Sequence, residues 1–377
     1  MYQIVIIGTG IAGYTLAREI RRIDTEKTIL LITSDDGVNY SKPMLSNALG
    51  QNKTPEQLAM SDADAMADTL KAEIRTHTIV QSIDTAARQI QTQNETIEYE
   101  NLILAVGAAP VHIPVDGDGA QDVLSVNTLT DYRVFREKLQ NAQTVAISGP
   151  GLIGCEFAND LLNADKKVHV IGPDKYALSS LLPEAIGLEL QTKLQQAGVQ
   201  WHLQTTVSKI DKNEASYQVS LNNDEQLEVD LVLSAAGLRP DVHLAKQAGL
   251  EVNVGIVADD YLQTSANNVY ALGDCVEANG QNLLYIMPLM NGAKALAKTL
   301  TGEPTKINYP IMPVAVKTPI YPLTVLLPAP QAKGQWQIEK TENSLEARFE
   351  SETGQMQGFI LAQEAVKKRM TYIKQLG

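Results

Sequence analysis

The chain has 377 residues, 44% of them hydrophobic, so it is long enough for two or three domains with apolar cores and is not a disordered or fibrous protein. Its 31 Lys and Arg against 44 Asp and Glu give a formal net charge of −13, which argues against general binding to nucleic acid. The two cysteines, Cys155 and Cys275, form neither a disulfide framework nor a CxxC or zinc spacing. The five histidines show no metal-ligand spacing, so we expect no bound metal.

The sequence shows no targeting or membrane signal. No stretch reaches the ~18–20 consecutive apolar residues of a membrane span, and the first residues lack the basic region and cleavage site of a secretory signal. Together with the low cysteine content, this predicts a soluble, unprocessed cytoplasmic protein.

The hydrophobic pattern predicts the same βαβ unit twice. Residues 2–7 form a continuous apolar strand, residues 11–22 have helical spacing, and residues 28–33 form a second strand. The pattern returns at residues 143–148, 155–163 and 167–171. Because parallel strands joined by a helix wind right-handed, we expect an α/β protein with two Rossmann-like nucleotide-binding units.

Each unit carries a glycine fingerprint, G-x-G-x-x-G, between its first strand and its helix. The glycines are Gly8, Gly10 and Gly13 in the first unit, and Gly149, Gly151 and Gly154 in the second. Glycine lets the backbone turn tightly and approach a pyrophosphate, which binds the free N–H groups at the helix N-terminus. One such fingerprint is a weak signal, but two in one chain predict that two dinucleotides bind.

The residues after the second strand of each unit indicate how the nucleoside part of the dinucleotide is bound. An acidic residue normally closes this strand and holds a ribose, but the first unit has Thr33 and Ser34 there, and we expect these two to contact the adenosine. A turn cap at the strand end is the alternative. In the second unit, Gly172 and Pro173 follow the strand without an arginine pair for a 2′-phosphate, which favours NADH over NADPH.

A third buried strand, at residues 269–272, ends in Gly273 and Asp274. A carboxylate at the C-terminal edge of such a strand can accept hydrogen bonds from a sugar-alcohol hydroxyl, and after two dinucleotide fingerprints we interpret Asp274 as a ligand of a flavin ribitol chain. A simple turn aspartate is the alternative.

The C-terminal part has a different character. The proline-rich residues 309–330 cannot form a long helix or a central strand, so they are expected to be a boundary with edge segments. Short strands are predicted at residues 336–338, 345–349 and 356–360, followed by a closing helix over 362–376. This region is interpreted as a small α+β domain.

Five motifs in order resemble those of the flavoprotein reductases with two dinucleotide-binding domains. They are the first fingerprint, LILAVGAAP at 102–110, the second fingerprint, LSAAGLRPD at 233–241 and YALGD at 270–274. Within that superfamily, YSKPMLS at 40–46 and VKTP at 316–319 look most like the bacterial rubredoxin-NAD reductases, including the flavorubredoxin reductases.

The resemblance implies a domain organisation and a set of cofactors. It implies an FAD domain over residues 1–109 and 242–314, an NAD domain over 110–241 and a C-terminal domain over 315–377. Tightly bound, non-covalent FAD would occupy the first unit, and NADH would bind in the second as co-substrate. The expected activity is transfer of electrons from NADH through FAD to rubredoxin.

The resemblance also implies roles for individual residues. The turn Gly8, Thr9, Gly10, Ile11, Ala12 and Gly13 matches the FAD pyrophosphate site, Val80 matches a strand whose backbone meets the adenine, and Asp274 matches the ribitol ligand. Lys42 matches a basic residue beside flavin N5, and Glu156 matches the acid that pairs with it. A fixed ammonium there would stabilise the negative charge that hydride transfer leaves on the flavin. Taken alone, both residues would be ordinary surface charges.

Two further residues are implied at the same flavin edge. Ile286 stands just before Pro288 at the start of an apolar helix, whose N-terminus would favour negative charge on the flavin. Lys317 matches a lysine near that edge, with a solvated lysine as the alternative. Residues 36–50 contain no cysteine, which excludes the dithiol relay of disulfide reductases, so Cys155 and Cys275 are interpreted as buried small residues.

Alternatives remain open at this level. The same fold serves NADH oxidases and ferredoxin reductases, and a nucleotide-responsive flavoprotein that acts as a binding module is a further possibility. Downstream of rubredoxin the resemblance suggests an alkane hydroxylase, with nitric oxide reduction as the second pathway. Rubredoxins are usually acidic, like this chain, so a local basic patch at Lys367, Lys368, Arg369 and Lys374 could offset the repulsion, although such a run is usually a solvated helix face.

Overall fold

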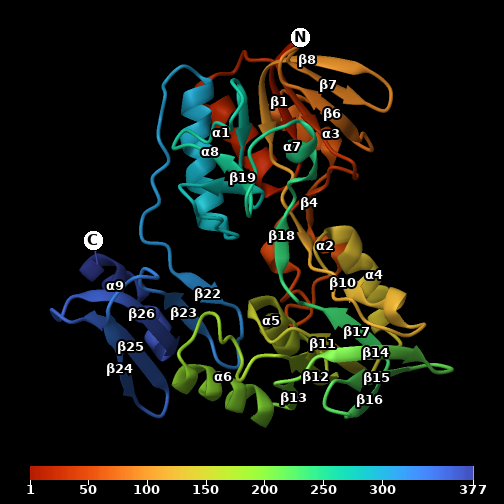
Figure 1. The fold of residues 1–377 in the computed structure, drawn as a ribbon, viewed down its shortest axis with the longest axis vertical. Coiled ribbons are helices and arrows are strands. Elements are labelled where there is room, and N and C mark those ends of the chain that lie inside the picture. The colour runs from red at the N-terminus through yellow and green to blue at the C-terminus, as the bar shows by residue number, and fades with distance from the viewer. Residues whose placement is uncertain (377) are drawn as a thin grey trace. The chain divides into compact units, whose positions relative to one another are not determined.

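The computed structural model describes residues 1–376, which form two compact units (Figure 1). Unit one comprises residues 1–42, 56–109 and 238–310, and unit two comprises residues 43–55, 110–237 and the described residues from 311 onward. The α/β fold class is confirmed. Unit one overlaps the expected FAD domain but lacks residues 43–55 and 311–314 and includes 238–241. The assignment of a cofactor to each domain stays a prediction.

Unit one is built on a mainly parallel sheet in the order β5-β2-β1-β8-β7-β6, with β20 paired to β8. Its strands are β1 (Tyr2–Ile7), β2 (Ile29–Ile32), β5 (Glu73–Arg75), β6 (Val80–Asp84), β7 (Gln89–Thr92), β8 (Thr96–Leu104) and β20 (Val269–Ala271). Short pairs add β3 (Asn39–Tyr40) to β4 (Ala59–Ser61), β9 (Ala108–Pro110) to β18 (Leu238–Pro240) and β19 (Ile256–Ala258) to β21 (Val276–Ala278).

The core of unit one lies between this sheet and two helices. In β1, Ile6 is in parallel register with Leu31 of β2 and Ile103 of β8, and all three side chains are fully buried. Helices α1 and α8 pack beside each other (Figure 1). The helices are α1 (Ile11–Ile23), α2 (Pro55–Leu58), α3 (Ala63–Leu70), α7 (His243–Gln247) and α8 (Ile286–Leu300). The predicted first βαβ unit is therefore confirmed. The apolar helix predicted to begin at Pro288 begins two residues earlier, at Ile286.

Unit two contains the second Rossmann-like sheet, which is parallel in the order β10-β17-β11-β12-β13. The strands are β10 (Leu124–Ser125), β11 (Thr144–Ser148), β12 (Lys167–Gly172), β13 (Val199–Leu203) and β17 (Leu231–Ser234). An antiparallel sheet follows β13 and consists of β14 (Val207–Lys212), β15 (Tyr217–Leu221) and β16 (Gln226–Val229). The helices are η2 (Ala120–Asp122), α4 (Leu129–Leu139), α5 (Leu152–Leu162) and α6 (Glu184–Gln196). This confirms the second predicted βαβ unit.

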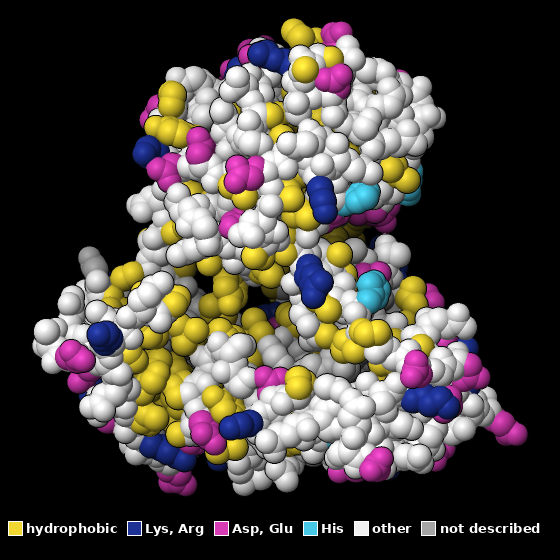
Figure 2. Space-filling model, in the orientation of Figure 1, with side chains coloured by type: hydrophobic (Ala, Val, Ile, Leu, Met, Phe, Trp, Pro, Cys, Tyr) yellow, Lys and Arg dark blue, Asp and Glu magenta, His cyan; other side chains and the backbone are white. Residues whose placement is uncertain are grey.

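The C-terminal part of unit two is an antiparallel sheet in the order β22-β23-β26-β25-β24, closed by a helix. Its elements are β22 (Val314–Val316), β23 (Leu323–Leu326), β24 (Gly334–Lys340), β25 (Ser344–Ser351), β26 (Met356–Gln363), the 3-10 helix η3 (Glu364–Lys368) and α9 (Arg369–Leu376). The three predicted strands are confirmed. Figure 2 shows hydrophobic side chains reaching the surface in the area where Figure 1 shows these strands. Leu327, Ile338 and Met370 of this C-terminal part are exposed.

One expectation about the proline-rich stretch was wrong. β23 lies inside it and is an interior strand, paired antiparallel to both β22 and β26. The four residues of β23 contain no proline, and the nearest prolines, Pro322 and Pro328, lie outside the strand. All backbone N–H groups needed for two ladders are therefore present.

Two further findings complete the fold. Among residues 1–376, no helix has the length and hydropathy needed to cross a membrane. The closing helix predicted over 362–376 begins only at Glu364, because residues 362 and 363 belong to β26, and it is divided into the 3-10 helix η3 and the α-helix α9.

Candidate functional site

The first glycine turn joins β1 to α1 and requires glycine for two different reasons. Gly8 has φ of +114°, and a Cβ there would overlap the carbonyl oxygen of Ala105. A Cβ at Gly13 would overlap the carbonyl oxygen of Gly8, so this glycine lets the helix pack against the turn. At Gly10, by contrast, an added Cβ would meet no atom within 4 Å. The open space is therefore at the middle glycine, where a pyrophosphate approaches a helix N-terminus.

Asp274 lies beside this turn. Gly273, with φ of +87°, brings the backbone so close to α1 that its Cβ would stand 2.9 Å from Cβ of Ala12. The side chain of Asp274 forms no hydrogen bond or ion pair with any residue of the described chain. Burial raises the pKa of its carboxyl, and the nearby charge of Lys42 opposes this. A half-buried carboxylate without a protein partner, next to an open glycine turn, fits the ribitol and pyrophosphate of FAD.

The other residues expected near FAD in unit one have mixed environments. Thr33 is buried, and its hydroxyl donates to Oδ1 of Asp35 at 2.6 Å, while Ser34 is exposed. Val80 is the first residue of β6 and packs against the core of unit one. Their contacts with adenosine stay predictions. Ser34 is free to rotate toward a ligand, whereas the hydroxyl of Thr33 already has a partner.

The second glycine turn, between β11 and α5, repeats the geometry of the first. Gly149 has φ of +124°, and a Cβ there would overlap the carbonyl oxygen of Ala235. A Cβ at Gly154 would overlap the carbonyl oxygen of Gly149, and Gly151 again has nothing within 4 Å. Thus unit two has its own space for a pyrophosphate at the start of α5, which fits the predicted nicotinamide dinucleotide.

Glu156 lies one turn into α5 and is the centre of a buried ionic cluster. Its side chain is 1% exposed and forms a salt bridge with Nζ of Lys317 at 2.8 Å. The backbone N–H of Lys317 donates to its Oε1 at 3.0 Å, and the hydroxyl of Ser46 donates to its Oε2 at 2.5 Å. A buried carboxylate is costly unless it is paired and hydrogen-bonded, and Glu156 meets both conditions.

The Lys317 ammonium is held from three sides. Besides Glu156, it donates to Oγ of Ser46 at 2.9 Å and to the carbonyl oxygen of Pro43. An ammonium has three N–H donors, so all three are used within unit two. The sequence predicted that Glu156 pairs with Lys42. The ion pair formed within unit two is with Lys317, and the role of Lys42 stays a prediction.

Two neighbours of Glu156 on α5 were missed by the sequence reasoning. Oδ1 of Asn159 accepts from the backbone N–H of Ile320 at 3.0 Å. The carboxylate of Asp160 accepts from the backbone N–H groups of Leu49 and Gly50 at 3.0 and 2.7 Å. Burial raises the pKa of Asp160, and these two donors oppose the shift. A signal was available, since three polar residues at i, i+3 and i+4 interrupt an otherwise apolar helix.

The polar face of α5 therefore clamps two loops of unit two. Glu156 and Asp160 hold the segment from Ser46 to Gly50, and Glu156 and Asn159 hold the segment from Lys317 to Ile320. The helix that begins at the second glycine turn thus fixes the polypeptide just after Lys42. A displacement of α5 would be transmitted to both loops.

Both cysteines are buried, as predicted. Burial raises the pKa of Cys275 to about 11 and raises that of Cys155 as well, so neither is a thiolate near neutral pH. Within residues 1–376, no group of three or more His, Cys, Asp or Glu side chains is arranged to hold a metal ion.

Comparison with known proteins places this site in a family. Residues 2–297 match the family model described as pyridine nucleotide-disulphide oxidoreductase. The chain belongs to this family. Residues 306–376 match a second model, described as rubredoxin binding C-terminal domain. The predictions of an oxidoreductase, of its FAD and NAD(H) cofactors and of rubredoxin as a partner are thereby confirmed at the level of the family.

Individual relatives cover nearly the whole chain. The chain is 45% identical to a rubredoxin-NAD(+) reductase of Acinetobacter baylyi, over 99% of this chain and 98% of the relative. It is 37% identical to a nitric oxide reductase FlRd-NAD(+) reductase of Aliivibrio fischeri, over 99% and 98%.

Solved structures agree in fold. A ferredoxin reductase of Rhodopseudomonas palustris matches with a TM-score of 0.89 at 24% identity, covering 98% of this chain and 93% of that one. The NADH:rubredoxin oxidoreductase of Clostridium acetobutylicum matches with a TM-score of 0.82 at 20% identity, covering 100% and 94%. At these identities the likeness concerns the fold alone.

Proposed function

We propose that the protein is a rubredoxin reductase that takes electrons from NADH, through FAD, to rubredoxin. The observation that carries the proposal is the presence, in one chain, of two glycine turns with open space and a C-terminal segment of the rubredoxin-binding type. When bound, FAD supplies the link between a two-electron hydride donor and a one-electron acceptor, which protein side chains cannot provide. The relatives of Acinetobacter baylyi and Alcanivorax borkumensis, at 45% and 43% identity, support this assignment.

The two units have separate tasks in this proposal. Unit one holds FAD through the Gly8 turn and Asp274, with Thr33, Ser34 and Val80 at its adenosine end. The Gly149 turn of unit two holds NADH, and the absence of an arginine pair after β12 favours NADH over NADPH. We assign Lys42 and the N-terminus of α8 at Ile286 to the flavin ring.

In this proposal the cluster with Glu156 fixes the position of the Lys317 ammonium. Because all three donors of the Lys317 ammonium are used by protein acceptors, its position is set before any ligand binds. A positive charge that needs no reorganisation stabilises negative charge developing close to it. Glu156 holds the ammonium in place through the salt bridge at 2.8 Å.

We further propose that the acceptor is a separate rubredoxin that supplies a hydrocarbon hydroxylase, and that the protein works in the cytoplasm. The identity to the relatives named simply rubredoxin-NAD(+) reductase, 43–45%, exceeds the 35–37% to those named nitric oxide reductase FlRd-NAD(+) reductase. The comparison to make is kcat/KM with an isolated rubredoxin against kcat/KM with a flavorubredoxin. A preference of about tenfold or more for the isolated rubredoxin is expected, and a preference for flavorubredoxin would favour the nitric oxide pathway.

An anaerobic assay tests the main proposal. The yellow holoprotein is mixed with NADH and oxidised rubredoxin, and the flavin and iron-sulfur absorbance bands are followed together. Fast bleaching of the flavin followed by catalytic bleaching of rubredoxin is the expected result. Flavin bleaching with rubredoxin left oxidised would reject the partner while keeping the NADH–FAD half. In that case oxygen and ferredoxins are the next acceptors to test.

A further inference from the structure

The charge of the chain is divided unevenly. The segment 306–376 has nine Lys and Arg and six Asp and Glu, a formal charge of +3 in a chain of −13, so the rest of the chain carries −16. A long-range field that repels acidic proteins therefore comes from outside this segment. The segment itself carries a net positive charge, which attracts an acidic partner.

Most cations of this segment are already paired. Lys317 pairs with Glu156, Lys340 with Glu189, Arg348 with Glu339 and Glu350, Lys368 with Glu346, and Lys306 with Asp260. Four exposed cations of the segment have no ion pair within residues 1–376, namely Lys333, Lys367, Arg369 and Lys374. Three of these four, Lys367, Arg369 and Lys374, lie close together in the sequence, from the end of η3 into α9.

Their spacing places two of them on one face. Lys367, Met370 and Lys374 are separated by three and four residues, so they follow one side of the closing helix. All three are exposed, and Met370 is 55% exposed, which makes an apolar centre between two ammonium groups. Arg369 lies at the edge of this side. Glu364, three residues before Lys367 and also exposed, lies on the same side by the same spacing, so three cations face one acid there. We call Lys367, Arg369, Met370 and Lys374 the basic face.

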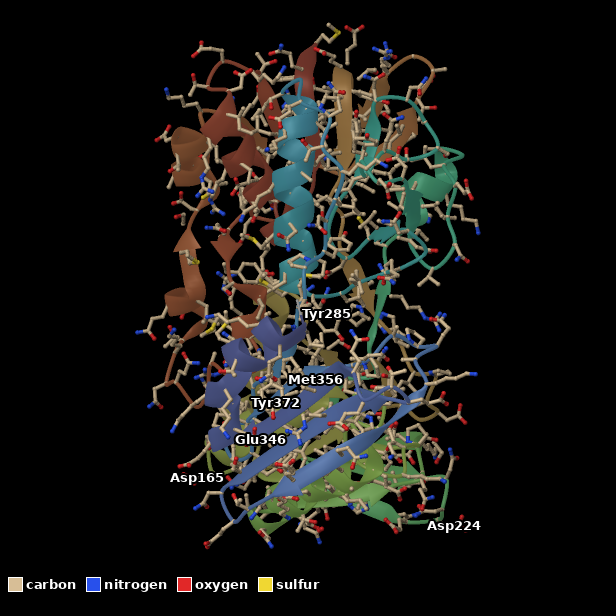
Figure 3. All side chains as sticks on the ribbon, turned by 90° about the vertical axis from the view of Figure 1, so that its left-hand side faces the viewer. Asp165, Asp224, Tyr285, Glu346, Met356 and Tyr372 are labelled. Carbon is tan, nitrogen blue, oxygen red and sulfur yellow. The ribbon has the colours of Figure 1, made fainter. Side chains whose placement is uncertain are left out.

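The opposite side of the helix is anchored, so the basic face has a fixed direction. Tyr372 is 5% exposed and packs against Phe359 with ring centroids 5.2 Å apart. Its hydroxyl donates to Oε2 of Glu346 at 2.7 Å (Figure 3). Lys368 donates to Oε1 of the same carboxylate at 2.6 Å. A face that is already ordered loses little conformational entropy when a partner binds.

We infer that the basic face is the docking surface for the acidic side of the rubredoxin partner. This inference rests on the proposed function. An apolar centre flanked by unpaired cations fits a small acidic protein that must bind and leave quickly, because the charges accelerate encounter while the contact area stays small. The charge of the face is complementary to that partner, although the net charge of the whole chain is not.

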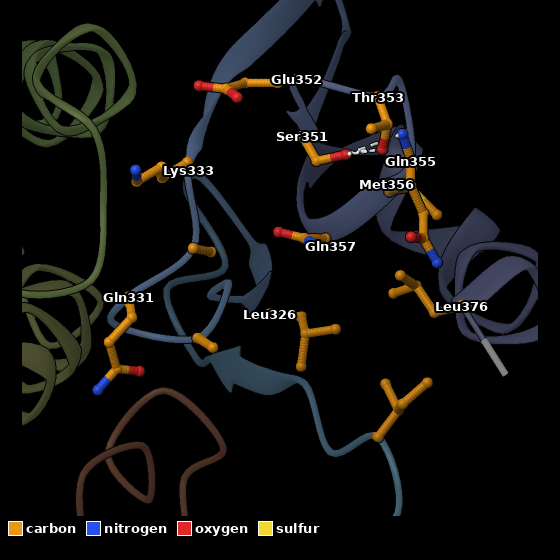
Figure 4. Close-up of a pocket in the computed structure, with 13 residues that line it drawn as sticks. Leu326, Gln331, Lys333, Ser351, Glu352, Thr353, Gln355, Met356, Gln357 and Leu376 are labelled. Carbon is orange, nitrogen blue, oxygen red and sulfur yellow. Dashed lines mark hydrogen bonds between the residues drawn. The ribbon is translucent and has the colours of Figure 1, made fainter.

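A pocket in the same C-terminal part is the alternative docking site to compare with the basic face. It has a volume of about 740 Å³ and lies between the turn at Gln331, the hairpin at Thr353 and Leu376 (Figure 4). One cation, Lys333, and one acid, Glu352, line it, so the formal charge of its wall is zero. Charge complementarity therefore favours the basic face over the pocket, and Lys333 serves as a matched control because it is also exposed and unpaired.

The experiment compares three holoprotein variants with the wild type. They are Lys367→Gln, the double variant Lys367→Gln with Lys374→Gln, and the control Lys333→Gln. Stopped flow gives the second-order rate constant for rubredoxin reduction as a function of NaCl, and flavin bleaching by NADH alone reports that the enzyme is otherwise intact. We expect the rate constant at low salt to fall about threefold in the single variant and about tenfold in the double variant, with a weaker salt dependence.

The outcomes separate the docking surface from the function. If the double variant reduces rubredoxin as fast as the wild type with the same salt dependence, the basic face is not the docking surface and the inference is wrong. If Lys333→Gln has the larger effect, docking belongs at the pocket and the inference is overturned in favour of that site. If the flavin of the wild type is bleached by NADH but no rubredoxin is reduced at any salt concentration, the proposed function is wrong, whatever the variants show. Unchanged flavin bleaching in each variant excludes misfolding as the cause.

Discussion

The first glycine turn, at Gly8, and the second, at Gly149, hold their backbones in the same way. In each, the first glycine has positive φ and lies against the carbonyl of the residue that directly follows a strand of the same sheet, Ala105 after β8 and Ala235 after β17. The third glycine lies against the first, and the middle glycine borders open space. The shared geometry is what a pyrophosphate requires, whichever dinucleotide carries it.

The helices that follow the two turns differ. The inner face of α1 is lined mostly by apolar side chains such as Leu16, Ala17 and Ile20, and the carboxylate near its turn, Asp274, comes from the residues after β20. The inner face of α5 carries its own acids, Glu156 and Asp160, which bind two loops of unit two. The turns therefore bind a common chemical group, while the surroundings of each turn decide what the unit does with it.

Substituting the first glycine of each turn is expected to have the largest effect. In Gly8→Ala and Gly149→Ala the new Cβ overlaps a backbone carbonyl and the residue is strained at positive φ, which together cost about 3 kcal/mol or more. We expect Gly8→Ala to lose bound FAD and Gly149→Ala to keep FAD but to bind NADH about 100-fold more weakly. Flavin absorbance after purification and NADH titration are the measurements.

A matched control for this prediction is Gly249→Ala. Gly249 also has positive φ, of +73°, but an added Cβ meets nothing within 4 Å. It should cost about 1 kcal/mol and leave both ligands bound. The interpretation of the turns would be contradicted if Gly8→Ala retained FAD at the wild-type level.

Substituting the middle glycines should separate ligand space from protein packing. Gly10→Ala and Gly151→Ala meet no protein atom, so the free energy of unfolding of the ligand-free protein should change by less than about 1 kcal/mol. We expect about tenfold weaker binding of FAD and of NADH respectively, because the methyl group occupies the approach to the pyrophosphate. Calorimetric titration together with thermal unfolding of the apoprotein measures both quantities.

The opposite pattern would count against the open space as a ligand site. If Gly10→Ala lowered the stability of the apoprotein without affecting FAD affinity, the turn would be structural only.

Removing the charge of Glu156 tests the difference between the two helices. Glu156→Gln leaves the Lys317 ammonium without its counter-ion and weakens the hold on both loops. Because Lys317 is 29% exposed, we expect a loss of stability of about 1–2 kcal/mol rather than the larger cost of a fully buried pair. NADH-dependent flavin bleaching should slow about tenfold or more. Chemical denaturation and stopped flow are the two measurements.

The conservative double variant Glu156→Gln with Lys317→Met provides the control, since it removes both charges. It should recover stability but not the rate. Recovery of the rate as well would show that the cluster only holds the loops in place.

The smallest expected effect concerns pH. The folded pKa of Asp160 lies above its ordinary value of 3.8, so the folded state binds this proton more tightly than the unfolded state does. The free energy of unfolding should therefore fall as pH rises from about 3.8 through the raised pKa. In Asp160→Asn this part of the pH dependence should disappear, while Glu352→Gln at an exposed position should keep it. Urea denaturation at a series of pH values provides the test, and an identical slope in Asp160→Asn would contradict it.

Much of the fold was predictable because its signals are local. A glycine fingerprint between an apolar strand and an amphipathic helix involves residues close in sequence, and both βαβ units were found where the pattern placed them. The C-terminal strands were found for the same reason. The position of β23 was not predicted correctly, because the prolines that flank a four-residue strand hide its ability to pair on both sides.

The candidate site was predictable only in part. Gly8, Gly149, Asp274 and Glu156 stand in motifs, and the sequence identified them. Ser46 was missed because a serine in a loop carries no signal until the fold brings it to Glu156. The polar spacing of α5 marks Asp160, but its partners, the backbone N–H groups of Leu49 and Gly50, are known only from the tertiary structure.

By itself the sequence determined that this protein has two dinucleotide turns, no dithiol in residues 36–50 and three short C-terminal strands, because each of these depends on residue types at short, fixed spacings. Only the tertiary structure showed that Lys317 pairs with Glu156, since Lys317 is 161 residues away and reaches it through the packing of unit two. It also showed that the cations of the basic face form no ion pair within residues 1–376, whereas the neighbouring Lys368 pairs with Glu346. Charge pairing depends on distance in space, which the order of residues along the chain does not give.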